Sequence, residues 1–105
     1  MSQSTEPSVA ELEALGGATL VEFGTSWCGH CARAQALIAE ALVGASGVRH
    51  IKVEDGPGRR LGRHYKVKLW PTLVFLRDGV EVSRLVRPED VTAIAGSLAA
   101  IGGDS

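Results

Sequence analysis

The chain has 105 residues, of which 45% are hydrophobic, and its formal net charge at pH 7 is -1. A chain of this length is expected to form one domain around one core. The balanced charge argues against a general affinity for nucleic acid or membrane surfaces. No apolar run approaches the roughly 18 residues that a membrane-spanning helix needs.

The polar start of the chain predicts a flexible tail over residues 1–7, followed by one domain over residues 8–105. The tail has neither the basic start nor the apolar segment of a secretory signal, so we expect a cytoplasmic protein. We also expect a monomer. Cytoplasmic reductants keep ordinary thiols reduced, which makes a stable structural disulfide the less expected use of the two cysteines.

Hydrophobic spacing, helix caps and turn signals predict eight elements in the order α-β-α-β-α-β-β-α. They are a short helix after a capping box at Ser8, a strand over 18–23, a helix from about Cys28, a strand over 48–54, a helix over 59–66, strands over 72–76 and 80–86 joined by Asp78-Gly79, and a helix from about Pro88. Strands joined through helices pair in parallel, whereas a hairpin is antiparallel. The sequence therefore predicts an α/β fold with a mixed four-stranded sheet and helices on both faces.

The two cysteines, Cys28 and Cys31, stand three positions apart where a helix is predicted to start after a buried strand. The partial positive charge of a helix N-terminus favours a thiolate, which is a nucleophile. Cys31 lies on the same helix face as Ala34 and Ile38 and should face the core, whereas Cys28 should be exposed. This geometry predicts Cys28 as the nucleophile and Cys31 as the resolving thiol. His30 between them adds positive charge when protonated, although a solvated histidine without a role is the alternative.

Other uses of the cysteine pair compete with redox exchange. A zinc site needs about four ligands, and the histidines lack the paired spacing of such a site. Covalent haem attachment requires a histidine directly after the second cysteine, where this chain has Ala32. A buried pair of cysteines without any redox function remains an alternative. We therefore expect no metal, and no cofactor other than the redox-active disulfide Cys28–Cys31.

Glu22 interrupts the otherwise apolar strand over 18–23. A buried carboxylate is costly unless it is neutral, paired or hydrated. Desolvation should raise its pKa toward neutrality, where it could exchange protons with a thiol. A carboxylate that reaches solvent from the end of the strand is the alternative.

Three motifs carry a resemblance to a known family. They are Val21-Glu22-Phe23, Trp27-Cys28-Gly29-His30-Cys31 and Trp70-Pro71-Thr72. Together they resemble the thioredoxin superfamily, and the Cys-Gly-His-Cys form is similar to the catalytic domains of protein disulfide isomerases. The resemblance implies a thioredoxin fold and dithiol–disulfide exchange with protein substrates. An electron donor such as thioredoxin reductase would recharge the cysteines.

The resemblance also assigns roles to individual residues. It makes Glu22 the proton acceptor of the resolving cysteine through water, with Lys52 as its neighbour. It makes the Trp70–Pro71 bond cis and lets the backbone of Trp70 pair with an extended substrate segment. Trp27 and Thr72 would complete this substrate surface, and Gly29 would support the cysteine motif.

Three positions depart from the family pattern: Ala36 replaces a proline that kinks the helix, Gly24 replaces a bulky aromatic residue, and Arg87 replaces a glycine of the substrate groove. Arg87 also resembles an isomerase arginine that lowers the pKa of the resolving cysteine, with a merely solvated Arg87 as the alternative. These departures leave room for a non-catalytic binding module or assembly chaperone. A peroxide-reducing enzyme is disfavoured, because its threonine-containing motif is absent around Cys28.

Overall fold

The structure is a computed structural model that describes residues 6–102. All eight predicted elements are present within this range. They are α1 (Val9–Glu13), β1 (Ala18–Gly24), α2 (Gly29–Val43), β2 (Arg49–Glu54), α3 (Arg60–His64), β3 (Thr72–Arg77), β4 (Val80–Val86) and α4 (Val91–Gly102). The predicted tail over residues 1–7 lies mostly outside the described residues. Within it, Glu6 forms an ion pair with Arg59, at 3.6 Å between Oε1 and a guanidinium nitrogen.

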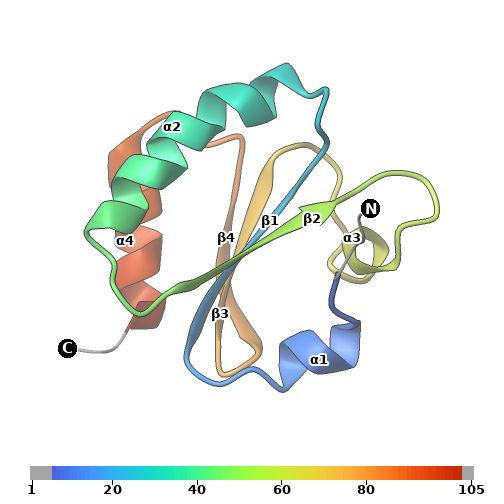
Figure 1. Cartoon of the computed structure of the whole chain (residues 1–105), viewed down its shortest axis with the longest axis horizontal. Helices are drawn as coiled ribbons and strands as arrows, with labels where there is room; N and C mark the ends of the chain where they lie inside the picture. The colour runs from blue at the N-terminus through green and yellow to red at the C-terminus, as the bar shows by residue number, and fades with distance from the viewer. Residues whose placement is uncertain (1–5, 103–105) are drawn as a thin grey trace.

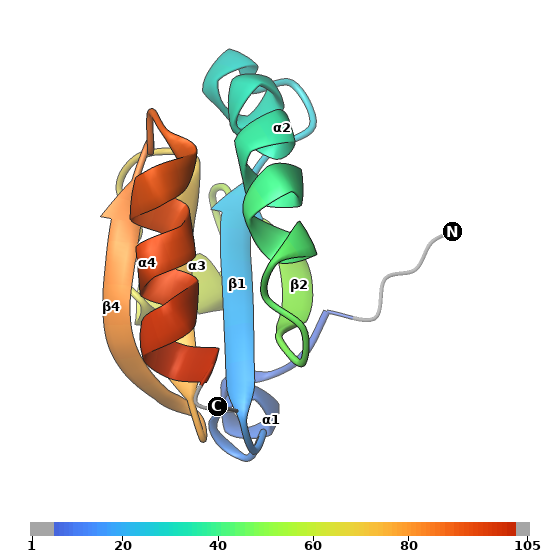
Figure 2. The same cartoon turned by 90° about the vertical axis from the view of Figure 1, so that its left-hand side faces the viewer.

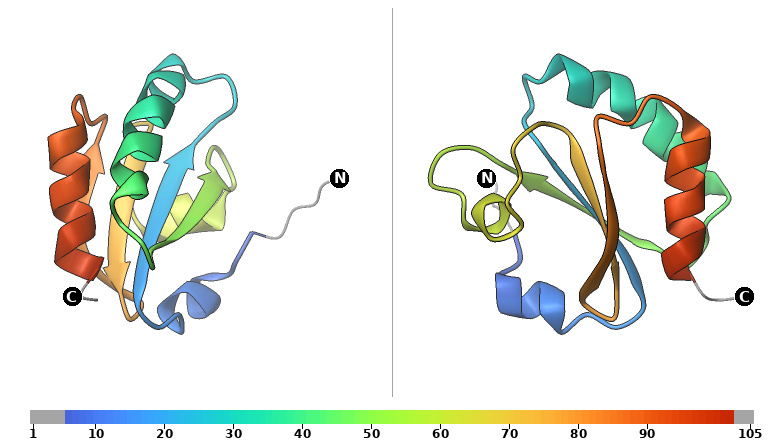
Figure 3. Two further views of the ribbon diagram at one scale, coloured as in Figure 1. Left: turned by 60° about the vertical axis from the view of Figure 1, so that its left-hand side comes forward. Right: turned by 180° about the vertical axis from the view of Figure 1, so that it is seen from behind.

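The four strands form one mixed sheet in the order β2-β1-β3-β4 (Figure 1). Strand β1 pairs with β2 in parallel and with β3 antiparallel, and β3 pairs with β4 antiparallel. Strands β2 and β4 therefore form the two edges of the sheet (Figure 3). This topology confirms the mixed sheet and the thioredoxin fold expected from the sequence.

Helices cover both faces of the sheet, with α2 and α4 on one face and α1 and α3 on the other (Figure 2). Each face has its own apolar cluster. Leu20 and Leu73 pack with the α2–α4 layer, whereas Val21 and Phe23 pack with the α1–α3 layer. Side chains alternate along a strand, so Glu22 lies on the same face as Leu20, toward α2.

Two helix boundaries differ from the prediction. Helix α3 ends at His64 rather than continuing to Lys66, because Lys66 takes a left-handed conformation with φ of 58°. Helix α4 begins at Val91 rather than with Pro88 in its first turn. The carboxylate of Asp90 accepts the backbone N–H of Ala93 at 2.8 Å, which is the geometry of an N-cap.

Topology brings the predicted motifs to one end of the sheet. Strand β1 ends at Gly24, and a short turn leads directly into α2 (Figure 1). Phe23 pairs with Thr72, so the end of β1 lies beside the start of β3 and the Trp70–Pro71 bond before it. Helix α2 runs unbroken through Ala36, in agreement with the absence of proline there.

Candidate active site

Cys28 is the N-cap residue of α2, with extended backbone angles of φ -87° and ψ 118°. Its Sγ accepts the backbone N–H of Cys31 at 3.1 Å. A sulfur in this position meets the unpaired N–H groups and the positive end of the helix dipole, both of which favour the thiolate form. Cys28 is partly exposed.

Cys31 lies one turn into the helix and is only 6% exposed. The pKa of its thiol is raised to about 11, first by burial and then by its hydrogen bond with the Cys28 side chain. The charges of Cys28 and Glu22 raise it further, whereas a backbone hydrogen bond at Thr25 opposes the shift. Both cysteines are free thiols. The structure thus places a partly exposed cysteine at the helix start and a buried cysteine with a raised pKa one turn later.

Gly24 has no Cβ atom, which leaves room for the Cys31 sulfur against the end of β1. A Cβ atom at this position would lie 2.6 Å from the Cys31 Sγ, well inside the ordinary contact range that begins at 3.4 Å. The missing side chain therefore lets the sulfur pack directly on the strand.

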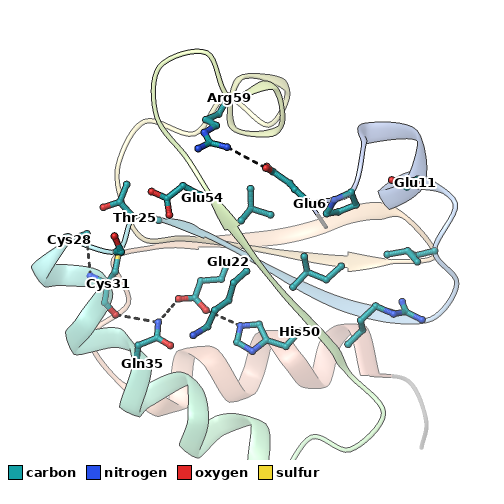
Figure 4. Close-up of a pocket in the computed structure, with 18 of the residues that line it drawn as sticks. Glu6, Glu11, Glu22, Thr25, Cys28, Cys31, Gln35, His50, Glu54 and Arg59 are labelled. Carbon is teal, nitrogen blue, oxygen red and sulfur yellow. Dashed lines mark hydrogen bonds and ion pairs between the residues drawn. The ribbon is translucent and has the colours of Figure 1, made fainter. Parts of the chain in front are cut away.

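Glu22 is 5% exposed and lies behind the cysteines, where its two carboxylate oxygens have separate partners (Figure 4). Oε1 lies 2.8 Å from the Nε2 of His50 on β2. Oε2 accepts a hydrogen bond from the side-chain amide of Gln35 on α2. The same amide also donates to the backbone carbonyl of Cys31 at 3.3 Å. Gln35 thus links the carboxylate to the resolving cysteine.

The pKa of Glu22 is lowered, contrary to the expectation from its sequence position. Burial is the largest single influence and does raise it. The hydrogen bonds of His50 and Gln35 outweigh that effect, together with the positive charge of Lys52 and the charge that His50 carries when it is protonated. The apolar strand indicated the desolvation of Glu22, but nothing in the sequence indicated that His50 and Gln35 are its hydrogen-bond partners. Lys52 is the neighbour of the acid that the resemblance implied, since it pairs with Glu22 in the β1–β2 register.

A pocket of about 1320 Å³ opens beside these groups. Its lining includes Glu22, Cys31 and His50, and Gly24 and Thr25 at the end of β1. Figure 4 shows the pocket residues arranged from the start of α2 across β1 to β2. The buried carboxylate therefore has a route to the surface past His50, whose side chain is 23% exposed compared with 6% for that of Glu22.

His30 does not supply the positive charge expected of it. Its pKa is lowered, chiefly by the charge of Arg87, with partial desolvation and the charge of Arg33 adding to the effect. Its Nδ1 lies 2.7 Å from a guanidinium nitrogen of Arg33, so this ring nitrogen acts as the acceptor. A histidine with a lowered pKa is mainly neutral at pH 7. The positive charge near the motif comes instead from Arg33 and Arg87.

Two tryptophans form an apolar surface next to the cysteines. Trp27 is 74% exposed, and its ring meets that of Trp70 edge to face at a centroid distance of 5.4 Å. The indole N–H of Trp70 donates to the carboxylate of Asp55 at 2.8 Å, which fixes the ring. The Trp70–Pro71 bond is cis, as the resemblance implies.

Thr72 and Arg87 do not take the positions that their predicted roles require. The Thr72 side chain is 1% exposed and its hydroxyl donates to the Leu69 carbonyl at 2.6 Å, so it braces the turn instead of facing a substrate. Arg87 is exposed, and its Nε donates to the Trp70 carbonyl at 2.8 Å. Arg87 is not among the groups that shift the pKa of Cys31.

Sequence reasoning missed three residues of this site, namely Gln35, His50 and Asp55. Gln35 could have been found, because a polar residue four positions after Cys31 interrupts the apolar face of α2. His50 and Asp55 gave no comparable signal. Their partners, Glu22 and Trp70, are far away in the sequence and are brought close only by the sheet and its connecting loops.

Residues 6–102 contain no group of three or more histidine, cysteine, aspartate or glutamate side chains placed to hold a metal ion. None of their helices has the length and apolar character needed to cross a membrane.

Comparisons with known proteins agree with this geometry. The family model described as Thioredoxin matches residues 6–100. Thioredoxin 2 from Pseudomonas aeruginosa PAO1, solved in its reduced form, superposes with a TM-score of 0.83 and 55% identity, covering 95% of this chain and 93% of that one.

Curated relatives come from two groups. A thioredoxin H-type protein from Oryza sativa subsp. indica is 30% identical over 71 residues, which are 68% of this chain and 58% of that protein. Protein disulfide-isomerase A2 from Pongo abelii is 39% identical over 82 residues, which are 71% of this chain but 14% of the isomerase. The match thus spans less than two thirds of the length of either relative.

Proposed function

Because this chain belongs to the thioredoxin family, we propose that it exchanges disulfides with protein substrates through Cys28 and Cys31. The observation that carries the proposal is the placement of the two sulfurs. One caps the helix N-terminus and accepts the N–H of residue 31, and the other is buried behind it with a pKa of about 11. Two-step exchange requires a reactive thiolate next to a protonated resolving thiol, and this arrangement provides both.

In the first step the Cys28 thiolate attacks one sulfur of a substrate disulfide. A bond forms between Cys28 and the substrate, the substrate S–S bond breaks, and one substrate thiolate leaves. In the second step Cys31 loses its proton and attacks the Cys28 sulfur. The Cys28–Cys31 disulfide forms and the second substrate thiolate leaves. The substrate gains two electrons and the cysteine pair loses two, with no bound cofactor.

The first step prepares the second. Once Cys28 is part of a mixed disulfide it carries no charge and no thiol proton. Two of the influences that raise the pKa of Cys31, the hydrogen bond and the charge of Cys28, are then removed. The pKa of Cys31 therefore falls below about 11 in the mixed disulfide, while burial and the charge of Glu22 still keep it raised. The proton leaves toward Glu22, the nearest buried carboxylate.

The docking surface for the substrate is the exposed ring of Trp27 with the neighbouring ring of Trp70, whereas Pro71 is buried beneath them and does not face a substrate. A large aromatic surface suits the apolar flanks of a substrate disulfide. An electron donor of the thioredoxin reductase type, in a reducing cytoplasm, would restore the dithiol. A reduction potential near about -270 mV would support such a reductant, and one near about -180 mV an isomerase-type couple.

Insulin reduction by dithiothreitol tests the proposal. We expect the protein to accelerate precipitation of the insulin B chain, and the Cys28→Ser variant to be inactive. The Cys31→Ser variant should instead accumulate a mixed disulfide with the substrate. Binding of substrate without any turnover by the unsubstituted protein would refute catalysis and favour the binding-module alternative.

A further inference from the structure

We propose that Glu22 and His50 act as one proton-accepting unit when Cys31 attacks, with His50 as a positioning residue that takes the proton on from the carboxylate. The inference rests on the proposed exchange reaction and adds a residue to its second step. It assigns His50 the function of passing a proton between the buried carboxylate and the open pocket.

The first argument is the position of His50. Its Nε2 lies 2.8 Å from the Glu22 Oε1, which is hydrogen-bond distance, and Gln35 holds the other carboxylate oxygen from α2. The carboxylate is therefore fixed from two sides, between the helix that carries Cys31 and the edge strand β2. A fixed carboxylate can exchange a proton with the imidazole without rearrangement of either side chain.

The second argument compares the two bases. The pKa of Glu22 is lowered, and the pKa of Cys31 is raised to about 11, so the carboxylate alone is a poor match for this thiol. An imidazole is in general a stronger base than a carboxylate. A proton that leaves Cys31 is therefore held better when the carboxylate and the imidazole share it than by Glu22 alone.

The third argument is access to solvent. The Glu22 side chain is 6% exposed, whereas that of His50 is 23% exposed and lines the pocket of about 1320 Å³. The imidazole can thus return its proton to water after each turnover.

The other charged or titratable groups that act on Glu22 and Cys31 are Lys52 on β2 and Cys28 at the start of α2. Strand β3 places the apolar Leu73 opposite Glu22.

The step balances without an added reactant. The step starts with Glu22 ionised and His50 neutral, its hydrogen on Nδ1. The Cys31 S–H bond breaks, and the proton passes through the Glu22 carboxylate to the free Nε2 of His50, which then donates back to Glu22 Oε1. The new thiolate forms the bond to the Cys28 sulfur and displaces the substrate thiolate. Water later removes the proton from His50, and the reverse sequence delivers a proton to Cys31 when the disulfide is reduced.

Stopped-flow reaction of the reduced protein with dithiobis(nitrobenzoate) separates the two steps. Attack by Cys28 releases one thionitrobenzoate anion, and attack by Cys31 on the resulting mixed disulfide releases a second. The first phase therefore tests the proposed function and the second phase tests this inference. Loss of the first phase in the unsubstituted protein would overturn both.

The decisive variant is His50→Gln, because the glutamine amide can still donate to Glu22 but cannot take up a proton. We expect the rate of its first phase to be unchanged and the rate of its second phase to fall by roughly tenfold to a hundredfold. Groups that transfer a proton directly typically contribute a rate factor of about 10²–10⁴, and His50, which acts through Glu22, should contribute at or below the lower end of that range. Added imidazole should enter the pocket and restore part of the lost rate.

His64→Gln is the matched control, because it makes the same substitution in an imidazole of α3 that pairs with Glu13 and not with Glu22. We expect its second phase to stay within a few-fold of the unsubstituted rate. A second phase of normal speed in His50→Gln, an equal slowing in His64→Gln, or a slowing that imidazole does not relieve would each overturn the proposal. Thermal unfolding of each variant verifies that it is folded.

Discussion

Replacing Gly24 with alanine should make the cysteine pair a stronger oxidant. The new Cβ would lie 2.6 Å from the Cys31 Sγ, whereas ordinary contacts begin at 3.4 Å. The backbone of Gly24 is not in the left-handed region, so alanine suits its conformation and only the contact with sulfur is changed. In the reduced protein the sulfur can rotate away from the added methyl group. In the oxidised protein its bond to Cys28 prevents that movement.

The size of the effect follows from the cost of crowding. Inserting one methyl group into a packed site costs about 1–3 kcal/mol. If the disulfide form bears most of this cost, the reduction potential rises by about 20–60 mV, since 1.4 kcal/mol corresponds to about 30 mV for two electrons. The attack of Cys31 on a mixed disulfide should slow as well, because the sulfur must return to the crowded position.

Equilibration with glutathione redox buffers, followed by quenching with an alkylating reagent, measures the potential. Gly96→Ala is the matched control, because its added Cβ meets nothing within 4 Å. That variant should keep the original potential and gain up to about 1 kcal/mol of stability from its position within a helix. An unchanged or lower potential in Gly24→Ala would refute the argument that the glycine makes room for the resolving sulfur.

Three further changes test other parts of the structure. Arg87→Gly should raise the pKa of His30, because the charge of Arg87 is the main cause of its lowering, and glycine suits the φ of 50°. Proton NMR titration of the ring would show this, and a larger rise in Arg33→Gln would contradict it. The Glu22→Gln variant should lose less of its free energy of unfolding than the unsubstituted protein as the pH falls. Since folding lowers the pKa of Glu22 below 4.5, its carboxylate stabilises the fold above that pH and less as the pH falls through the folded value. Urea unfolding at several pH values measures the difference, and parallel curves for the two proteins would argue against it. Ser8→Ala should cost about 1 kcal/mol in urea unfolding, because the hydroxyl caps α1; no loss would mean that the cap is not stabilising.

The arrangement of elements could be predicted because its signals are local. Apolar periodicity identified α2, and the capping box at Ser8 identified the start of α1. The roles of Cys28 and Cys31 followed from their positions on one helical turn, where the spacing of side chains is known in advance. The helix boundaries at Lys66 and Asp90 were less accessible, because they depend on one backbone conformation and one cap.

The environment of Glu22 shows where prediction from sequence ends. Its burial was evident from the apolar strand, and burial alone raises the pKa of a carboxylate. His50 is 28 positions away in sequence and Gln35 is 13 positions away, yet they decide the sign of the shift. Arg87 likewise reaches the Trp70 carbonyl across 17 positions, which no local pattern indicates.

Local signals were thus enough to predict the element order, the cysteine pair and the buried acid, because each depends on neighbours within a few residues or on one motif. The direction of the pKa shift of the acid, its contact with His50 and the room that Gly24 leaves for the Cys31 sulfur could be found only in the folded chain. These properties depend on distances between atoms of different strands and helices. Such distances exist only after the sheet has brought β1, β2 and α2 together.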